Sequence, residues 1–476
     1  MSQALLAGLP LLVACGALAL RMPALRAALL GILVALGVVA VAFRDHLGEL
    51  GSGLVGWAPT LIEVLVILGG GIALSRIMDR SGAQGVLADW VGRLTGGPVP
   101  TALLVVHGVT PFAESVTGFG VGVMVGVPLL VAAGFGPHRA AVLGLLGLCA
   151  VPWGALGPGT IIAGRLIGAS AQEVGVATAW PNLLVFVGVG VAAVLIASPG
   201  RPAPVHLGAA LLSGLLVGLG VLASNILIGM APSGALGALL AIVGHVLVRR
   251  AQGAPVRMAR EVRRALVPYV VLLAGILVSA WTVPLLPVGG AGALLTSPGT
   301  WLVVTCLVAV SWTRLAGPER AAVAREVVSM WQGVALPTAA FLALGVVMVL
   351  GGLTEPLARA LGSTGPFALV LTPVIGALGG YVTGSGAGAN SMFAAGTGAV
   401  APGLGVSPVG LVGVQNAAAC LFTMASPARV LLAVVSTPRD GVAETDRASL
   451  PRVTRSVLVV DLVLVACLAA WNLVVL

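Results

Sequence analysis

Apolar stretches long enough to cross a lipid bilayer recur along almost the whole of this chain. It has 476 residues, of which 59% are hydrophobic and only 8% are charged. A soluble protein usually carries about 25% charged residues on its surface, and a helix needs about 20 consecutive apolar residues to span the hydrocarbon. We therefore predict an all-α fold, a polytopic transmembrane helical bundle that forms one membrane domain over residues 1–476.

The basic residues exclude several classes of function. All 24 of them are arginine, whereas a Walker A loop and a Schiff-base site both need lysine. The net charge of +9 comes from arginines in short loops, which the positive-inside rule explains better than nucleic-acid binding does. The five cysteines lie in apolar segments without a CxxC pair, and the sequence predicts neither a metal nor another cofactor.

The arginine-rich loops set the expected orientation of the chain. They lie at 21–26, 199–206, 249–264, 312–326 and 439–455, and the positive-inside rule places such loops in the cytoplasm. The apolar stretches between them give about a dozen crossings, with the N-terminus outside. No basic start precedes the first apolar stretch, so we expect no cleavable signal peptide.

A weak internal repeat divides the chain. VTGFGVG at 116–122 resembles VTGSGAG at 382–388, and Cys149 and Cys420 follow at matching places. The arginine loops give the two copies opposite orientations, which is typical of secondary transporters. In the other interpretation, the small residues only let helices pack closely. We predict a first inverted repeat at 57–198, connecting helices at 199–330, a second inverted repeat at 331–440 and a C-terminal transmembrane helix at 456–476.

The segment GVTPFAESVTGFGVG, at 108–122, interrupts one of the apolar stretches. Pro111 removes a helical hydrogen bond, and Gly118, Gly120 and Gly122 weaken the helix further. Freed backbone groups within hydrocarbon survive only inside protein or beside a watery cavity, and free N–H groups at a broken end can hold an anion. We therefore predict broken or re-entrant helices here and at the matching segment, 383–396.

Glu114 has two interpretations. A charged side chain in the middle of the bilayer costs about 2.5–3.5 kcal/mol on insertion scales, so it needs a reason to be there. Inside the bilayer, Glu114 either exchanges a proton during transport or braces the broken backbone through fixed hydrogen bonds; otherwise it is exposed at a helix end. His107 either relays protons to Glu114 or packs as a neutral core residue. Glu63 and Asp461 are the other carboxylates in apolar stretches, and the sequence assigns them no role.

The second copy carries neutral polar groups instead of a carboxylate. Such groups suit a carboxylate or hydroxyl substrate, although each of them fits helix–helix hydrogen bonding equally well. Arg165 and Arg429 each follow the proline of their copy and could pair a substrate carboxylate bidentately; the alternative is that they snorkel at helix ends. The neutral candidates are Thr383, Ser385, Asn390, Ser391, Gln415, Asn416, Thr423 and Ser426.

The order of several segments resembles the lactate permease family. PFAESVTGFGVGV, WGALGPGTIIAG, TGSGAGANSMF and MASPARVLLA follow one another as in that family. Glu114, Gly118, Phe119 and Gly120 match its Glu-x-x-x-Gly-Phe-Gly segment. The resemblance spans most of the chain. It implies a symporter that carries protons with lactate or a related 2-hydroxy monocarboxylate across the bacterial inner (plasma) membrane.

Three places depart from the family pattern. Gly-Leu at 147–148 stands where family members have Asn-Thr, Gly386 stands in place of an aspartate, and Thr423 in place of a lysine. That lysine could have served the substrate carboxylate, so its absence directs attention to Arg165 and Arg429. A divergent member that moves another small organic anion is the alternative.

We expect a secondary transporter rather than an enzyme, because the histidines and acidic residues are scattered, without HExxH or a paired aspartate motif. The leading hypothesis is proton-coupled transport of lactate or a related acid; the alternatives are another small organic anion, with Na⁺ as coupling ion, and a passive channel. The expected partners are the anion, protons and the lipid bilayer, with no nucleic acid and no ATP. The predicted substrate and proton site comprises Glu114, Thr117, Gly118, Phe119, Gly120, Thr383, Gly384, Ser385, Asn390, Asn416, Thr423 and Ser426, with Arg165 and Arg429 as carboxylate partners and His107 as a proton relay.

Overall fold

The computed structural model describes residues 2–94, 96–198, 200–253, 258–287, 291–313, 315–438 and 447–476. Helices make up the regular structure of these residues, and none of the described segments forms a strand. Eleven of the described helices are long and apolar enough to cross a membrane. The structure therefore confirms the predicted all-α, polytopic transmembrane bundle.

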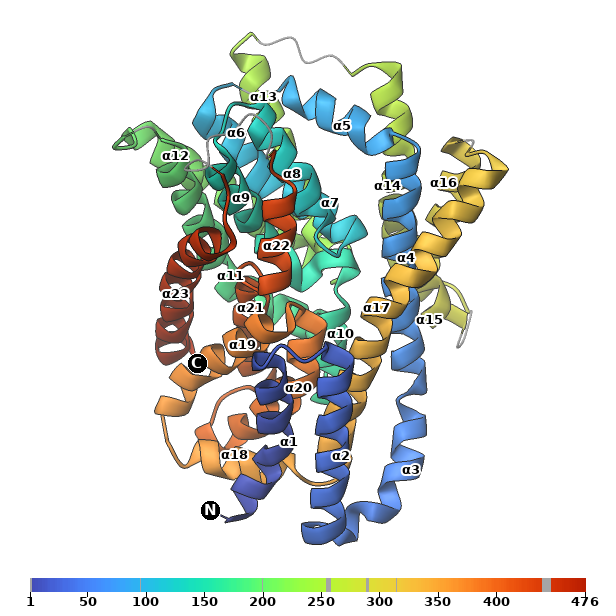
Figure 1. Ribbon diagram of the computed structural model, residues 1–476, viewed down its shortest axis with the longest axis vertical. Coiled ribbons are helices and arrows are strands. Elements are labelled where there is room, and N and C mark those ends of the chain that lie inside the picture. The colour runs from blue at the N-terminus through green and yellow to red at the C-terminus, as the bar shows by residue number, and fades with distance from the viewer. Residues whose placement is uncertain are drawn as a thin grey trace.

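The chain begins with a helical hairpin at the lower end of the molecule in Figure 1. The turn of this hairpin lies at mid-height, and Ala24 beside it lines a central cavity. The predicted cytoplasmic loop 21–26 therefore does not reach the end where the other arginine-rich loops gather. The N-terminal elements are α1 (Ser2–Ala19), α2 (Ala24–Ala42), η1 (Arg44–His46) and α3 (Leu47–Gly56).

A first series of helices follows, within the range predicted for the first repeat. It starts with α4, which runs to the upper end of the molecule, where the short α5 lies across it (Figure 1). The series comprises α4 (Ala58–Arg80), α5 (Ala83–Gly92), α6 (Pro98–Leu104), η2 (Val105–Val109), α7 (Thr110–Thr117), α8 (Val121–Ala132), α9 (Pro137–Leu146), η3 (Gly147–Leu156), α10 (Pro158–Leu166) and α11 (Ala171–Ala197).

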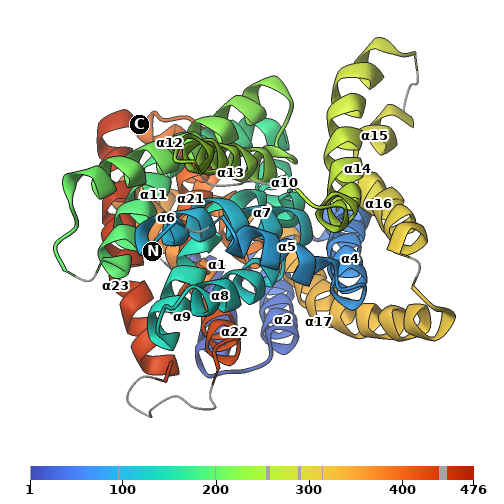
Figure 2. The same cartoon turned by 90° about the horizontal axis from the view of Figure 1, so that it is seen from above.

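The connecting helices flank this series on two sides. Seen from above, α12 and α13 lie beside α11, while α14 to α16 stand at the opposite edge, next to α4 (Figure 2). They are α12 (Pro204–Leu227), α13 (Ser233–Ala251), α14 (Arg260–Thr282), η4 (Val283–Leu285), α15 (Ala291–Thr296) and α16 (Pro298–Thr313).

A second series repeats the order of the first with the opposite direction. Its first helix, α17, runs away from the upper end towards the short α18 at the lower end (Figure 1). The series comprises α17 (Gly317–Leu350), α18 (Thr354–Gly362), α19 (Phe367–Thr383), α20 (Gly386–Val400), η5 (Ala401–Leu404), α21 (Pro408–Phe422), α22 (Pro427–Val435) and α23 (Leu450–Val475). By this order α23 corresponds to α11, so a second repeat defined by the helices would include α23. The boundaries expected from the sequence stay a prediction.

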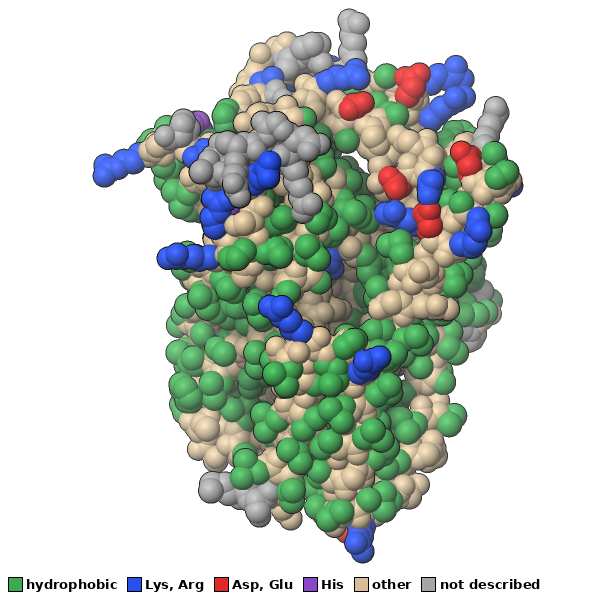
Figure 3. All heavy atoms as spheres, in the orientation of Figure 1, with side chains coloured by type: hydrophobic (Ala, Val, Ile, Leu, Met, Phe, Trp, Pro, Cys, Tyr) green, Lys and Arg blue, Asp and Glu red, His purple; other side chains and the backbone are tan. Residues whose placement is uncertain are grey.

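Charge divides the molecule along its long axis. Arginine side chains gather mainly over the upper part, and hydrophobic side chains cover most of the rest of this face (Figure 3). The upper part of the molecule holds α5, the end of α13 and the starts of α12, α14 and α17 (Figure 1). This distribution matches the positive-inside rule with the upper end in the cytoplasm. Residues 199, 254–257, 314 and 439–446 of the predicted cytoplasmic loops lie outside the described residues.

Both series contain interrupted helices. Between α7 and α8, Gly118, Phe119 and Gly120 have φ of 71°, 57° and 84°, a left-handed region that a side chain rarely adopts. Gly384, between α19 and α20, has φ of 64°. The predicted breaks are therefore present. The chain stays helical at Pro111, because the π-helical turn η2 just before it absorbs the missing hydrogen bond.

Candidate functional site

The two interrupted helices meet at one cavity of about 470 Å³. Gly118 and Phe119 line it from the first break, and residues 383–388 line it from the second. The starts of α10 and α20 touch there: a Cβ added to Gly159 would lie 2.8 Å from the carbonyl carbon of Gly386. Such an approach between backbones is open only to glycine, so the small residues in both segments allow the contact.

Glu114 is the acidic group of this cavity, and it is 3% exposed. Gly120 N–H donates to its two carboxylate oxygens at 3.1 and 3.0 Å, and Gly122 N–H donates to Oε2 at 3.3 Å. These are free N–H groups at the start of α8, so the carboxylate caps the helix that the break creates. These hydrogen bonds are the ones that the bracing interpretation of Glu114 expects, and proton exchange at Glu114 stays a prediction.

Arg429 lies opposite Glu114 on α22. Its Nη1 is 3.2 Å from Glu114 Oε1, and its side chain is 14% exposed. Among the described residues that line the cavity, Arg429 is the one cation and Glu114 the one anion. A Cβ on Gly120 would lie 2.7 Å from Arg429 Nη1, so glycine there leaves room for the guanidinium. The structure therefore brings together two predicted residues that lie far apart in the sequence.

The second break offers hydroxyl and backbone groups to the same cavity. Thr383 Oγ1 donates to the carbonyl oxygen of Gly379 at 2.7 Å and accepts from Ser385 N–H at 3.2 Å. Ser385 Oγ accepts from Gly388 N–H at 3.4 Å and caps α20. Ser426 Oγ is buried without a hydrogen-bond partner, and a Cβ on Gly384 would lie 3.1 Å from it. The predicted polar residues here surround the turn of the second break.

Asn390 and Asn416 lie behind the cavity wall in a buried hydrogen-bonded network. Asn390 Nδ2 donates to Asn416 Oδ1 (2.8 Å) and to Gly159 O (3.0 Å). Asn416 Nδ2 donates to Thr160 Oγ1 (3.1 Å) and Thr178 Oγ1 (3.0 Å). Gln415 Nε2 completes the network on Asn390 Oδ1 at 2.8 Å. In this structure these amides join helices rather than face the cavity, which is the alternative the sequence had left open.

Three further predicted residues also point elsewhere. Thr117 Oγ1 donates to Ala113 O, and Thr423 Oγ1 donates to Cys420 O at 2.6 Å. His107 is fully buried, with Nδ1 2.9 Å from Ser213 Oγ and Nε2 2.9 Å from Phe186 O. Both ring nitrogens of His107 are therefore occupied by α11 and α12, and no described contact links it to Glu114. The packed interpretation fits these contacts, so we carry no relay role forward.

Arg165 lines a different cavity of about 720 Å³ at the far end of α10, together with Glu63. It is exposed and does not reach the cavity of Glu114. The predicted carboxylate partners are therefore separated: Arg429 lies in the central cavity and Arg165 outside it.

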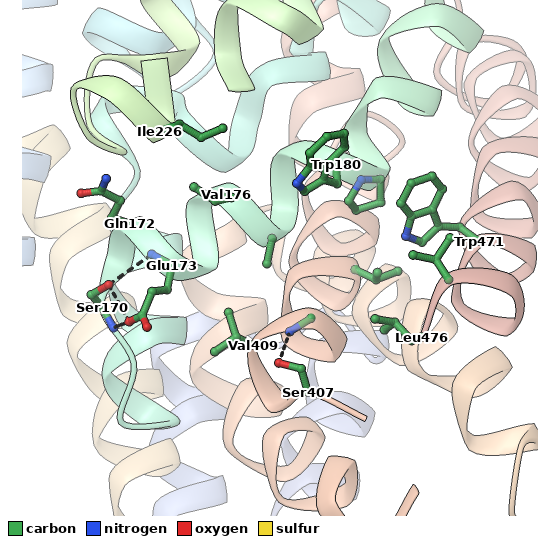
Figure 4. A pocket seen from close by; sticks show the side chains of 15 residues that line it. Ser170, Gln172, Glu173, Val176, Trp180, Ile226, Ser407, Val409, Trp471 and Leu476 are labelled. Carbon is green, nitrogen blue, oxygen red and sulfur yellow. Dashed lines mark hydrogen bonds between the residues drawn. The ribbon is translucent and has the colours of Figure 1, made fainter. Parts of the chain in front are cut away.

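A third cavity, of about 860 Å³, lies between α11, α21 and α23. Figure 4 shows Trp180 and Trp471 on one side of it and Ser170 with Glu173 on another. The polar groups are already used, because Ser170 and Glu173 form the capping box of α11. Tryptophan and capping groups are typical of the interface between membrane and water, and we do not place the substrate there.

Sequence reasoning missed two walls of the central cavity. One comes from η3 and contains Pro152, Gly154 and Ala155; the other comes from α17 and contains Pro337 and Thr338. The available signal in α17 was Pro337, a proline inside an apolar stretch, which indicates a bend in the helix but not which cavity the helix lines. Among the described residues, no group of three or more His, Cys, Asp or Glu side chains is placed to hold a metal ion.

A multi-pass helical bundle whose interrupted helices enclose a charged cavity defines a membrane transporter. The family model described as L-lactate permease matches residues 3–291 and 287–470. The chain therefore belongs to the L-lactate permease family, and the resemblance noted from its motifs is confirmed. A protein named L-lactate permease from Streptococcus iniae is 25% identical over an alignment of 425 residues, which covers 83% of this chain and 90% of that protein.

Two solved structures are similar at a greater distance. The YdaH transporter of Alcanivorax borkumensis has a TM-score of 0.47 and 16% identity, covering 90% of this chain and 88% of that one. MtrF of Neisseria gonorrhoeae has a TM-score of 0.39 and 13% identity, covering 88% and 85%. Both likenesses are too distant to bear on the activity of this chain.

Proposed function

We propose that this chain carries lactate, or a closely related small 2-hydroxy monocarboxylate, together with a proton across the bacterial plasma membrane. Membership of the L-lactate permease family supports the substrate class. The single observation that carries the coupling is the ion pair between Glu114 and Arg429 inside the central cavity.

The pair gives a physical reason for proton and anion to bind together. Arg429 is neutralised by Glu114 while Glu114 is ionised. A proton on Glu114 removes that negative charge and leaves the guanidinium available to another carboxylate. An arginine pairs with a carboxylate through two parallel hydrogen bonds, so the substrate replaces Glu114 as the partner of Arg429. Without the proton, the substrate carboxylate would meet a site that is already neutral and a second negative charge beside it.

The second break supplies the groups that suit a 2-hydroxy acid. Thr383 and Ser385 bring hydroxyl groups to the cavity, and the start of α20 brings backbone N–H groups. Helix N-termini favour negative charge and hydrogen-bond acceptors. We assign the substrate hydroxyl to this side of the cavity and its carboxylate to Arg429.

The departures from the family pattern bear on the substrate. Thr423, at the place of the family's lysine, bonds to Cys420 O and does not line the cavity. The described lining therefore offers a single cation, which matches a substrate with one carboxylate. Another small organic monocarboxylate is the second candidate, and a dicarboxylate fits this lining poorly.

Transport by reconstituted protein tests the proposal. Proteoliposomes that hold a pH-sensitive dye are given labelled lactate on the outside. We expect lactate uptake to acidify the lumen, and an imposed pH gradient to drive lactate beyond its own electrochemical equilibrium. Glu114→Gln keeps the size and hydrogen-bonding shape but cannot exchange a proton, so both responses should disappear.

The matched control is Glu355→Gln, at an exposed carboxylate on α18 that sits 3.9 Å from Arg359. It should leave uptake and acidification at the wild-type level. Uptake that does not depend on the pH gradient but needs external Na⁺ would show that sodium, and not the proton, is the coupling ion. Uptake that never exceeds equilibrium would make the protein a channel.

A further inference from the structure

A second carboxylate, that of Asp461, is buried in the membrane part of the molecule without any role so far. It lies on α23, which runs along one edge of the bundle beside α11 (Figure 2). Asp461 is 0% exposed and belongs to the inward stripe of α23 together with Val457, Leu464 and Val465. The opposite face of α23 carries exposed leucine and valine side chains. The carboxyl group thus points away from the bilayer into an apolar part of the protein interior.

Neither oxygen of this carboxyl group has a hydrogen-bond partner among the described residues. Helix α23 packs against α9, α11, α19, α21 and α22. No described hydrogen bond or ion pair joins Asp461 to a group on these helices or on its own. The titratable and charged groups there are His138, Arg139, Glu173, Tyr381, Cys420, Arg429, Arg452, Arg455 and Cys467.

The two buried carboxylates, Glu114 and Asp461, have opposite surroundings. Glu114 receives backbone N–H groups and a guanidinium, which stabilise its charged form. Asp461 receives none of these, and an unpaired charge in such surroundings is strongly unfavourable. Glu114 therefore has, and Asp461 lacks, the partners that a buried negative charge requires, in one and the same conformation.

We propose that Asp461 is a second proton-binding site of this transporter and that it carries a proton in the conformation described here. Ionisable residues inside membrane proteins are retained where they serve ion or proton movement, and an apolar side chain would fill the stripe on α23 equally well. The proton binds the carboxylate oxygen when Asp461 is in contact with outside water, and it leaves to the cytoplasm when the helices around α23 rearrange.

The proposal rests on the proposed function and gives it a stoichiometry. A monocarboxylate that enters with the Glu114 proton alone moves no net charge. A second proton on Asp461 makes each cycle carry one positive charge inward. Membrane potential, negative inside, then drives uptake in addition to the pH gradient.

The test measures the number of protons per lactate in proteoliposomes of the full chain. Membrane potential is set with potassium and valinomycin, the pH gradient is varied, and the condition of zero net lactate flux gives the ratio. We expect two protons per lactate in the wild type. In Asp461→Asn we expect one proton per lactate, with uptake still driven by the pH gradient but insensitive to membrane potential. Asp461→Glu should restore the potential dependence.

The matched control is Asp45→Asn, at an exposed aspartate in η1, which should keep the wild-type ratio. A ratio of two protons in Asp461→Asn would overturn the proposal, and so would a wild-type ratio of one. Both results leave the Glu114 mechanism intact. Lactate uptake by the wild type without any proton movement would instead refute the proposed function.

Infrared spectroscopy tests the proton on Asp461 without transport. A protonated carboxyl group has a C=O stretching band that a carboxylate lacks. We expect this band in the wild type at neutral pH, and we expect it to be missing in Asp461→Asn. A wild-type spectrum without the band would overturn the proposal whatever the transport assay shows.

Discussion

At the scale of single residues, Glu114 combines two tasks that the sequence presented as alternatives. Its carboxylate completes the hydrogen bonding of a broken helix and also pairs with a cation in the cavity. The brace fixes the carboxylate in position, so a change in its protonation alters the charge in the cavity without moving the backbone far. Positioning by hydrogen bonds is what a site needs if one proton is to control access to one guanidinium.

The shape of the Arg429 side chain matters as much as its charge. Lysine presents a point charge without the planar fork that holds a carboxylate bidentately. We therefore expect Arg429→Lys to raise the KM for lactate about tenfold, a loss of about 1.4 kcal/mol, with a smaller change in kcat. Initial rates of uptake over a range of lactate concentrations measure both constants.

The control is Arg359→Lys, at the exposed partner of Glu355 on α18, which should leave both constants unchanged. An unaltered KM in Arg429→Lys, together with normal uptake, would mean that the substrate carboxylate does not bind at Arg429.

At the scale of helices, the amide network fixes the short α10 against its neighbours. Asn390 and Asn416 connect α20 and α21 to the start of α10, and Asn416 also reaches α11 through Thr178. Asn390 bonds the carbonyl of Gly159, which lines the cavity. The network therefore holds one wall of the cavity in place, although its amides do not face the cavity.

Removing the centre of this network should destabilise the protein. Asn416→Ala removes four hydrogen bonds, to Asn390, Thr160, Thr178 and the thiol of Cys420. Buried hydrogen bonds between membrane helices contribute about 0.6 kcal/mol each on average and up to about 1.7. We expect a loss of about 2–4 kcal/mol in the free energy of unfolding, seen as a lower Tm in a thermal-shift assay of the detergent-purified protein.

Asn472 provides the comparison, because its side chain donates one hydrogen bond, to Leu369 O at 2.9 Å. Asn472→Ala should lower the Tm by a smaller amount than Asn416→Ala. Equal decreases in Tm in the two variants would contradict the claim that several hydrogen bonds of the network contribute to stability.

The sequence predicted the elements better than it predicted the side-chain partners. The breaks at Gly118–Gly120 and Gly384 follow from local backbone chemistry, which a sequence displays directly. Whether Asn390 faces a cavity or a neighbouring helix depends on the rotation of α20 against α10, and no local pattern encodes that rotation. For the same reason, neither the sequence around Glu114 nor that around Arg429 could predict that the two side chains pair.

At the scale of the whole molecule, the opposite direction of the two helical series explains why the breaks meet. The first series opens with α4, which runs to the upper end, and the second opens with α17, which runs to the lower end (Figure 1). Interrupted helices that occupy corresponding places in the two series then approach each other from opposite sides near the middle. The internal repeat and the arginine loops indicated this arrangement, whereas the contributions of α17 and η3 to the cavity came only from the structure.

The central claim is that a substrate carboxylate replaces Glu114 as the partner of Arg429 in the cavity between the two breaks. A cryo-electron microscopy structure of the full chain with lactate, determined at acidic pH, tests it most directly. We expect density for lactate against the Arg429 guanidinium, between residues 118–119 and 383–388, with Glu114 released from the pair. Lactate bound beside Arg165 instead, or unbroken helices through residues 118–120 and 384–385, would contradict the claim.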